Sequence, residues 1–205
     1  MFKKLIQVGI VTKDIKKIVK NYNEIYKIGP WYMINFSAKN VDSMTLYGKR
    51  QDYSMDLAVC PIGKIRFEYI NPVSSSIYED FYEKYGEGVV HHLKLDVNDT
   101  KTTLNSIKEK GVDMIQSGNQ LGDSGENQYY YVDTQKKLGF ITEIVNITKD
   151  FIKPQPEYWY PSEDYIPDPI FAGVSMIGIV VKNLEEKIKD VKELIKHVVV
   201  IVVKT

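Results

Sequence analysis

Four polar side chains in this sequence could together hold one divalent metal ion. Gln7 and His92 lie on the opening strands of two similar units, while Glu68 and Glu143 lie on the closing strands. One amide oxygen, one imidazole and two carboxylates suit zinc, nickel, cobalt, manganese or magnesium. Their regular placement predicts a four-ligand site that is built by pseudo-symmetry.

The elements that must position these residues repeat along the chain. In the first half, a strand precedes a helix that Asp14 can cap, and three strands follow. The second half repeats this order after a connecting helix, with Asp99 or Thr100 as the cap. The expected strands are Leu5–Val11, Tyr32–Phe36, Tyr53–Val59, Ile65–Ile70, Val89–Val97, Val112–Gln116, Tyr129–Val132 and Phe140–Val145. The fold class is therefore α+β, with two βαβββ modules forming a curved mixed sheet around a central cleft.

Alternation along the strands indicates which side chains share a face. Leu93 and Leu95 are expected to face the helix, so His92 points away from it. The same argument turns Gln7 and Glu68 away from their helix. Glu143 shares its face with apolar residues and is less clear. If the two sheets curve toward each other, all four candidate ligands converge on the cleft.

Composition narrows the classes of function. The 205 residues include 27 basic and 27 acidic side chains, so the net charge is zero. Such a chain has no long-range field to attract nucleic acid or an anionic membrane. The single cysteine, Cys60, excludes an intramolecular disulfide. No signal peptide or bilayer-spanning stretch is recognisable, so we expect a cytoplasmic protein without membrane or nucleic-acid partners.

The C-terminal part predicts an incomplete third unit. We expect one domain over residues 1–150, with modules at 1–73 and 86–150, followed by a linker rich in proline and aromatic residues at 151–172. Residues 173–205 then begin a partial third module. Its phrase Met176–Leu184 resembles the strand that carries Gln7, and a helix and a valine-rich run follow.

Four motifs together resemble the vicinal oxygen chelate superfamily. This superfamily includes glyoxalase I, methylmalonyl-CoA epimerase, extradiol dioxygenases and bleomycin-resistance proteins. The motifs are Gln7-Val-Gly-Ile-Val, Glu68-Tyr-Ile-Asn-Pro, Gly86-Glu-Gly-Val-Val-His-His-Leu and Gly139-Phe-Ile-Thr-Glu-Ile-Val. They cover residues 5–147 in the family's order, and the segment with two histidines is most similar to the epimerase.

The resemblance implies a metal-dependent isomerase or lyase that acts on a small molecule. The family's ligand positions fall on Gln7, Glu68, His92 and Glu143, while His91 is expected to face away from the metal. A carboxylate, Glu68 or Glu143, would remove a proton next to a carbonyl and return it elsewhere. The epimerase's separate glutamate base falls near Gln51 and Asp52; neither is a glutamate, although Asp52 could replace it. Family members are often dimers, so we also expect a homodimer.

Other interpretations of the same residues remain open. Glu68 shares a face with Arg66, and His92 shares one with Lys94, so these side chains could form ion pairs in a polar cleft. Bleomycin-resistance relatives bind a small molecule without metal or turnover, which is the alternative function. An extradiol dioxygenase is disfavoured, because Gln7 stands where its iron site needs a second histidine.

Overall fold

The fold confirms the two predicted modules. A computed structural model describes residues 2–120, 128–147 and 155–195. The first module contains β1 (Phe2–Val11), α1 (Ile15–Tyr26), β2 (Trp31–Phe36), β5 (Met55–Ile62) and β6 (Ile65–Pro72). After α2 (Ile77–Tyr85), the second contains β7 (Val90–Val97), α3 (Thr100–Lys108), β8 (Met114–Gln120), β9 (Gln128–Val132), α4 (Gln135–Leu138) and β10 (Ile141–Val145). Both modules therefore have the core order βαβββ.

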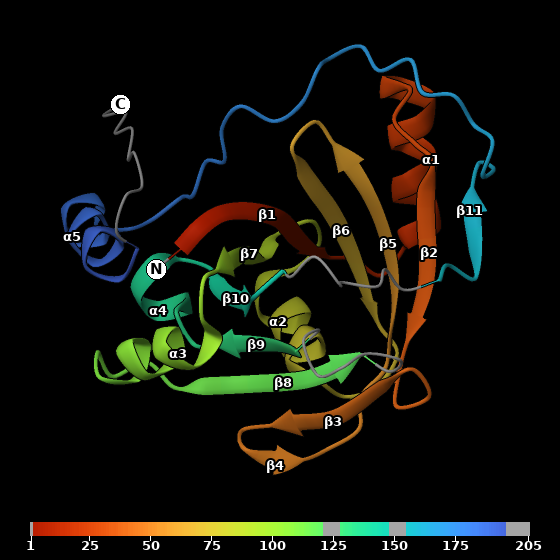
Figure 1. Cartoon of the computed structure of the whole chain (residues 1–205). Coiled ribbons are helices and arrows are strands. Elements are labelled where there is room, and N and C mark those ends of the chain that lie inside the picture. The colour runs from red at the N-terminus through yellow and green to blue at the C-terminus, as the bar shows by residue number, and fades with distance from the viewer. Residues whose placement is uncertain (1, 121–127, 148–154, 196–205) are drawn as a thin grey trace.

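The strands form one strongly curved, unclosed mixed sheet (Figure 1). Its order is β11-β2-β5-β6-β1-β7-β10-β9-β8-β3-β4. The two modules join where β1 pairs with β7 in antiparallel orientation, and each opening strand also pairs in parallel with its own closing strand. The four strands that carry the candidate ligands are thus neighbours at the centre of the sheet.

Two features of the first helices agree with the sequence. The side chain of Asp14 accepts a hydrogen bond from the Lys17 amide, and Asp99 accepts one from the Thr102 amide. Each carboxylate therefore satisfies an amide that has no partner within its helix. These caps fix where each helix starts after the opening strand of its module.

Apolar residues on both sides of the sheet hold it in place. Outside the first module, Val8 and Ile10 of β1 pack against Ile15 and Val19 of α1. A second outer cluster lies under α3 and α4. The third cluster lies on the concave side and includes residues of α2. Burying one face of each opening strand in this way turns the alternate side chains toward the hollow.

A hairpin of β3 (Val41–Leu46) and β4 (Lys49–Arg50) was not expected. Tyr47 and Gly48 form its tight turn with φ values of 48° and 75°, as a two-residue hairpin turn requires. The strand β3 pairs with β8, and the paired residues lie 70 to 79 positions apart in the chain, from Leu46–Gln116 to Val41–Gln120. Such a distant partner leaves no signal in the local sequence.

The C-terminal segment crosses the outside of both modules. We call residues 155–182 the C-terminal strap. It begins with β11 (Tyr158–Tyr160), which extends the sheet beside β2, and it leads across the molecule to α5 (Leu184–Leu194) beside α4 (Figure 1). Residues 176–183 form no strand, although they resemble the strand that carries Gln7, and the partial third module at 173–205 stays a prediction. The valine-rich run lies outside the described residues, and the boundaries at 150 and 172 stay predictions.

Helices in the described ranges are all too short or too polar to cross a membrane. The cytoplasmic location stays a prediction.

Candidate active site

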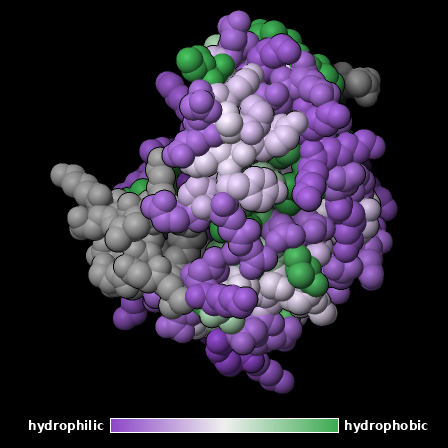
Figure 2. All heavy atoms as spheres, turned by 90° about the vertical axis from the view of Figure 1, so that its right-hand side faces the viewer, coloured by the Kyte–Doolittle hydropathy of each residue, from purple (hydrophilic) through white to green (hydrophobic). Residues whose placement is uncertain are grey.

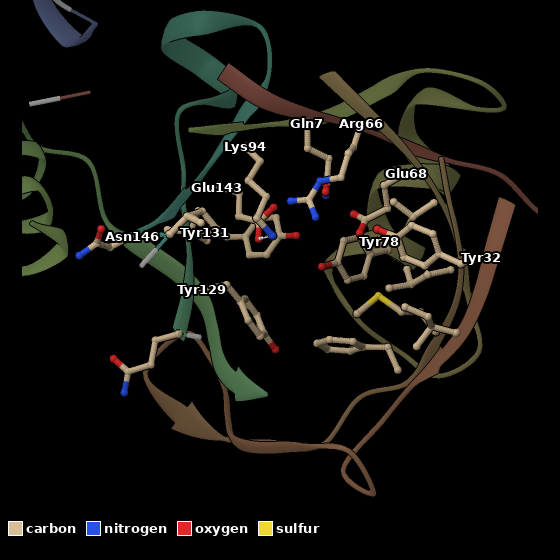
Figure 3. A pocket seen from close by; sticks show the side chains of 18 residues that line it. Gln7, Tyr32, Arg66, Glu68, Tyr78, Lys94, Tyr129, Tyr131, Glu143 and Asn146 are labelled. Atoms are coloured by element: carbon tan, nitrogen blue, oxygen red, sulfur yellow. Dashed lines mark ion pairs between the residues drawn. The ribbon is translucent and has the colours of Figure 1, made fainter. Parts of the chain in front are cut away.

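A cavity of about 80 Å³ lies on the concave side of the sheet. Gln7, Glu68 and Glu143 line it, together with the cations Arg66 and Lys94 (Figure 3). Apolar side chains of β2 and β5 and the rings of Tyr78, Tyr129 and Tyr131 form most of the remaining wall, and residues 128 and 145–147 complete it. A few polar groups in a largely apolar hollow are typical of a small-molecule site. The space exceeds what one water molecule needs several times over.

His92 lies directly behind the cavity wall. Its imidazole is fully buried, and its Nε2 lies 3.1 Å from Glu143 Oε2 and 3.4 Å from Glu68 Oε2. Gly9 of β1 makes room for it, because a Cβ built on Gly9 would lie only 1.9 Å from His92 Cε1. The sheet register places Gly9 opposite both His92 and Glu68. A glycine at this point lets the imidazole lie between the two carboxylates.

Glu143 is held firmly by two partners. Lys94 Nζ lies 2.7 Å from its Oε1, while Oε2 is the atom that faces His92. The register of β10 and β7 places Glu143 directly opposite Lys94. Burial alone would raise the pKa of Glu143, but the Lys94 ammonium and the His92 imidazole outweigh it and lower the pKa to about 2. Glu143 is therefore an ionised carboxylate whose Oε1 is paired with Lys94.

Glu68 has the opposite surroundings. Its side chain is 13% exposed, compared with 3% for Glu143, and its only close ion-pair contact among the described residues is with His92. Burial raises the pKa of Glu68, and the negative charge of Glu143 adds to this effect, although His92 opposes it. Glu68 is thus the more accessible carboxylate and the one that accepts a proton more readily.

One buried polar atom at this site, Gln7 Nε2, has no hydrogen-bond partner, and the Gln7 side chain is only 2% exposed. His92 Nε2 and Glu143 Oε2 lie 3.1 Å apart, but they are not aligned as a good hydrogen bond. Buried polar groups are normally paired, since leaving one unpaired costs about 1–3 kcal/mol. Three buried polar atoms with incomplete hydrogen bonding on three neighbouring strands indicate a place where another group can bind.

These donors fit a divalent ion in type, but they are not yet arranged as a metal cluster. Within the described ranges, no three His, Cys, Asp or Glu side chains form a group that could hold a metal. His92 lies between the carboxylates, so Glu68 and Glu143 must turn toward a shared point before both can be ligands. The bond from Lys94 to Glu143 Oε1 leaves Oε2 available, as is usual for a hydrogen-bonded ligand carboxylate.

The ion-pair interpretation of the sequence also describes contacts that are present. His92 and Lys94 both contact Glu143, and His92 contacts Glu68 as well. Lys94 was not a predicted site residue, although its position two residues after His92 puts it on the same face of β7. That alternation was the signal that could have found it.

His91 is a further residue whose role the sequence did not reveal. Its Nδ1 lies 3.1 Å from His92 Nδ1, and it is fully buried next to Tyr78 and Phe81. The register shifts between the pairs Gly9–His92 and Ile10–Val90, so His91 is the extra residue of a bulge. Burial and the neighbouring His92 lower the pKa of His91 well below its usual range, which keeps it neutral. It can therefore accept a hydrogen bond from His92.

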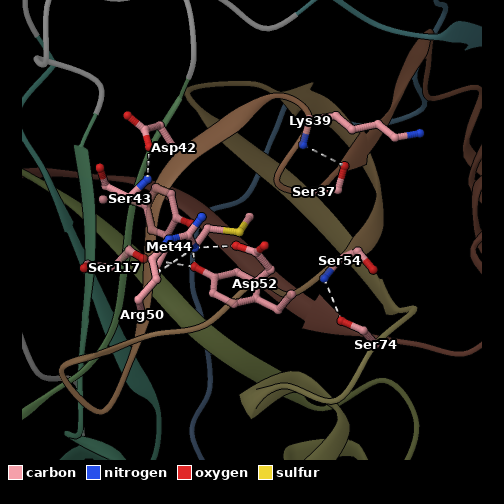
Figure 4. A network of polar contacts seen from close by, with 12 residues as sticks. Ser37, Lys39, Asp42, Ser43, Met44, Arg50, Asp52, Ser54, Ser74 and Ser117 are labelled. Atoms are coloured by element: carbon pink, nitrogen blue, oxygen red, sulfur yellow. Dashed lines mark hydrogen bonds and ion pairs between the residues drawn. The ribbon is translucent and has the colours of Figure 1, made fainter.

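Asp52 does not belong to the site. Its side chain is 61% exposed and forms an ion pair with Arg50, as Figure 4 shows. Arg50 also donates to the Met44 carbonyl, and Asp52 is absent from the residues that line the cavity. The suggestion that Asp52 replaces the epimerase's separate base was therefore wrong. The unexpected β3–β4 hairpin holds this region outside the hollow.

Comparisons with known proteins agree with this architecture. A family model described as the glyoxalase/bleomycin resistance protein/dioxygenase superfamily matches residues 6–131. A search of curated proteins found no match.

Two similar solved structures are methylmalonyl-CoA epimerases. One from Mycobacterium tuberculosis is 16% identical with a TM-score of 0.52, over 72% of this chain and 89% of that chain. A variant of the Streptomyces coelicolor enzyme, solved with 2-nitronate-propionyl-CoA, is 18% identical with a TM-score of 0.51, over 75% and 100% of the two chains. At these identities the likeness establishes the fold alone.

Proposed function

The chain belongs to the glyoxalase/bleomycin resistance protein/dioxygenase superfamily, and from this premise we propose that it transfers a proton at a carbon next to a carbonyl group. The proposed enzyme is a metal-dependent isomerase or lyase, similar to glyoxalase I or methylmalonyl-CoA epimerase. The observation that carries the proposal is the group of polar atoms on Gln7, His92 and Glu143 beside the cavity, whose hydrogen bonding is incomplete. The epimerases among the structural neighbours are consistent with this chemistry.

In the proposed mechanism, Glu68 is the base. It borders the cavity and has more exposed surface than Glu143, so a substrate can reach it. A carboxylate at this position can take up a proton and return it. Glu143, which Lys94 keeps ionised, suits a permanent negative charge. Two carboxylates in contrasting surroundings can thus fill different roles.

Gln7, Glu68, His92 and Glu143 are the proposed ligands of one divalent ion. When bound, the ion would supply a Lewis acid that polarises the substrate carbonyl and makes the neighbouring C–H more acidic. The residues of the chain orient the substrate and hold the proton. The tyrosines and the apolar residues of β2 and β5 exclude water from the reacting carbon.

Exchange of the substrate proton for solvent deuterium tests the proposed base. We expect metal-loaded protein in D₂O to exchange the α-proton of a racemic 2-methylacyl-CoA or of a methylglyoxal–thiol adduct. Glu68→Gln should slow this exchange by about 100-fold or more, because the amide cannot accept the proton. Glu83→Gln, which changes an exposed carboxylate on α2, serves as the matched control. Mass spectrometry of the substrates measures both rates.

The alternative function is binding of a small molecule without turnover. It is favoured by the pairing of Glu143 with Lys94, which neutralises one of the acids without a metal. If the metal-loaded protein exchanges no proton with either substrate but still binds them, this alternative replaces the enzymatic proposal. Equal exchange rates in wild type and Glu68→Gln would instead reject Glu68 as the base.

A further inference from the structure

Three side chains with hydrogen-bond donors form a row across the wall of the cavity. Arg66 on β6, Gln7 on β1 and Lys94 on β7 are register partners, because Gln7 pairs with Arg66 on one side and with Lys94 on the other. All three line the cavity, and Figure 3 shows them along the same wall. The row therefore presents a guanidinium, an amide and an ammonium group to the same space.

Several N–H groups of these three side chains have no acceptor among the described residues. Among the described residues, no carboxylate lies within ion-pair distance of Arg66, whereas Lys94 is paired with Glu143. Gln7 Nε2 is buried and has no hydrogen-bond partner. An ammonium group has three donors, so Lys94 keeps two N–H groups beyond its bond to Glu143. Arg66 is thus the one cation of this row that forms no ion pair among the described residues, and its nearest acidic influence is the more distant charge of Glu68.

We propose that Arg66, Gln7 and Lys94 bind a carboxylate group of the substrate. A guanidinium can donate two parallel hydrogen bonds to a planar carboxylate, and an ammonium and an amide can complete its coordination. The class of ligand is therefore a small acyl compound that carries a free carboxylate. This inference rests on the proposed function, since it names the substrate class of the same site.

The position of Arg66 relative to the proposed base supports this assignment. Arg66 and Glu68 are two residues apart on β6, so they point to the same side of the strand. Both line the cavity. A carboxylate held by Arg66 would therefore place the rest of a short acyl chain beside Glu68. This docking would orient the carbon that loses its proton and would select against neutral analogues.

Binding of malonate to the metal-free protein tests the proposal. The full-length chain is treated with a chelator, and malonate is titrated by calorimetry. We expect Arg66→Gln to weaken malonate binding by about tenfold or more, because a charge-assisted contact is lost. Lys64→Gln is the matched control, since it removes a cation from the exposed end of the same hairpin. It should leave malonate binding unchanged.

Two further ligands identify the chemistry that is recognised. Malonamide has a similar shape without charge and should bind far more weakly than malonate. Inorganic phosphate should also bind more weakly: a guanidinium can hold either anion with two hydrogen bonds, but phosphate has no methylene group to pack against the apolar wall of the cavity. Phosphate binding that equals malonate binding and depends on Arg66 would overturn the carboxylate assignment. Equal malonate affinity in wild type and Arg66→Gln, or no binding to wild type, would overturn the site.

A second substitution, Arg66→Lys, keeps the proposal testable if Arg66→Gln fails to fold. It retains the charge but not the fork, so we expect binding between that of wild type and Arg66→Gln. Wild-type affinity in Arg66→Lys would contradict paired hydrogen bonding by the guanidinium. Because the titration is done without metal and without turnover, failure of the proposed catalysis would not change its outcome. Loss of metal uptake and loss of malonate binding can therefore be told apart.

Discussion

At the residue scale, Glu68 and Glu143 show how surroundings give one functional group two behaviours. Lys94 and His92 hold Glu143 in place and keep it ionised. Glu68 borders the cavity, and burial raises its pKa. His92 contacts both carboxylates, so its orientation decides how they are arranged. The orientation of this one imidazole is therefore central to the site.

His91 is expected to fix the tautomer of His92. A ligand nitrogen at His92 Nε2 requires the proton on Nδ1, and His91 Nδ1 is within 3.1 Å to accept it. His91→Phe keeps a buried ring but removes the acceptor. We predict that this change weakens metal affinity by about 10–100-fold, as measured by competition with a coloured chelator.

The control for this prediction is His91→Gln, which retains an acceptor and should bind metal more tightly than His91→Phe. Unfolding curves of both variants show whether stability changes. If His91→Phe binds the ion as tightly as wild type, His91 has only a packing role.

At the element scale, the antiparallel pair of β1 and β7 forms the centre of the site. These strands carry Gln7 and His92, and the bulge at His91 lets two consecutive histidines contact each other. Gly9 lies between Glu68 and His92 on the neighbouring strands. The missing side chain at Gly9 is thus part of the site's geometry.

Gly9→Ala is predicted to displace the His92 ring. The new Cβ would lie 1.9 Å from His92 Cε1, so the imidazole or the strands must move. We expect a loss of about 1–3 kcal/mol in the free energy of unfolding and a loss of metal binding. Denaturant titration and metal competition measure the two effects. Gly178→Ala, whose Cβ would contact nothing within 4 Å, is the control. Unchanged metal binding in Gly9→Ala would contradict the arrangement of His92.

The limits of sequence-based prediction also lie at this scale. Local periodicity and the repeated phrases predicted the two modules, because their strands and helices bury one face each. The β3–β4 hairpin was missed, since its partner β8 is distant in sequence. The phrase at 176–184 resembles the strand that carries Gln7, yet residues 176–183 form no strand, and Val180 is fully exposed. Apolar residues permit a strand, but a free sheet edge is needed to form one.

For the candidate site, the sequence predicted the positions of the four ligands but not the contacts between them. The four proposed ligands are placed on adjacent strands, and three of them line the cavity. The pairing of Lys94 with Glu143 depends on the register of β7 and β10, which no local pattern gives. The contact between His91 and His92 depends on a bulge that arises only when β1 and β7 pair. Such features come from tertiary contacts and not from strand alternation.

At the scale of the whole molecule, the C-terminal strap links the two modules. Phe171 packs against Tyr26 of α1, and Tyr165 lies against Gly29. Further along, Ile179 and Val181 contact the turn at Gly139 in the second module. On the face of the molecule that Figure 2 shows, the hydrophobic residues of the described part lie in small separate groups. The expected homodimer stays a prediction.

Gly63→Ala tests how much the strap stabilises the fold. Gly63 has a φ of 66°, and a Cβ there would lie 2.9 Å from the Ala172 carbonyl oxygen. Gly48→Ala carries a similar backbone strain, at a φ of 75°, but its Cβ would meet nothing. We expect about 1 kcal/mol of destabilisation for Gly48→Ala and at least about 1 kcal/mol more for Gly63→Ala. Chemical denaturation measures both; equal losses would show that the strap contact contributes little.

Metal content is the most direct test of the central claim that Gln7, Glu68, His92 and Glu143 act as one site. The purified chain is dialysed against each divalent ion and analysed for its elemental composition. We predict about one ion per chain for the wild type and essentially none for the His92→Ala, Glu143→Ala double variant, with circular dichroism confirming that both are folded. Equal ion content in the two proteins, or no uptake by the wild type, would contradict the account.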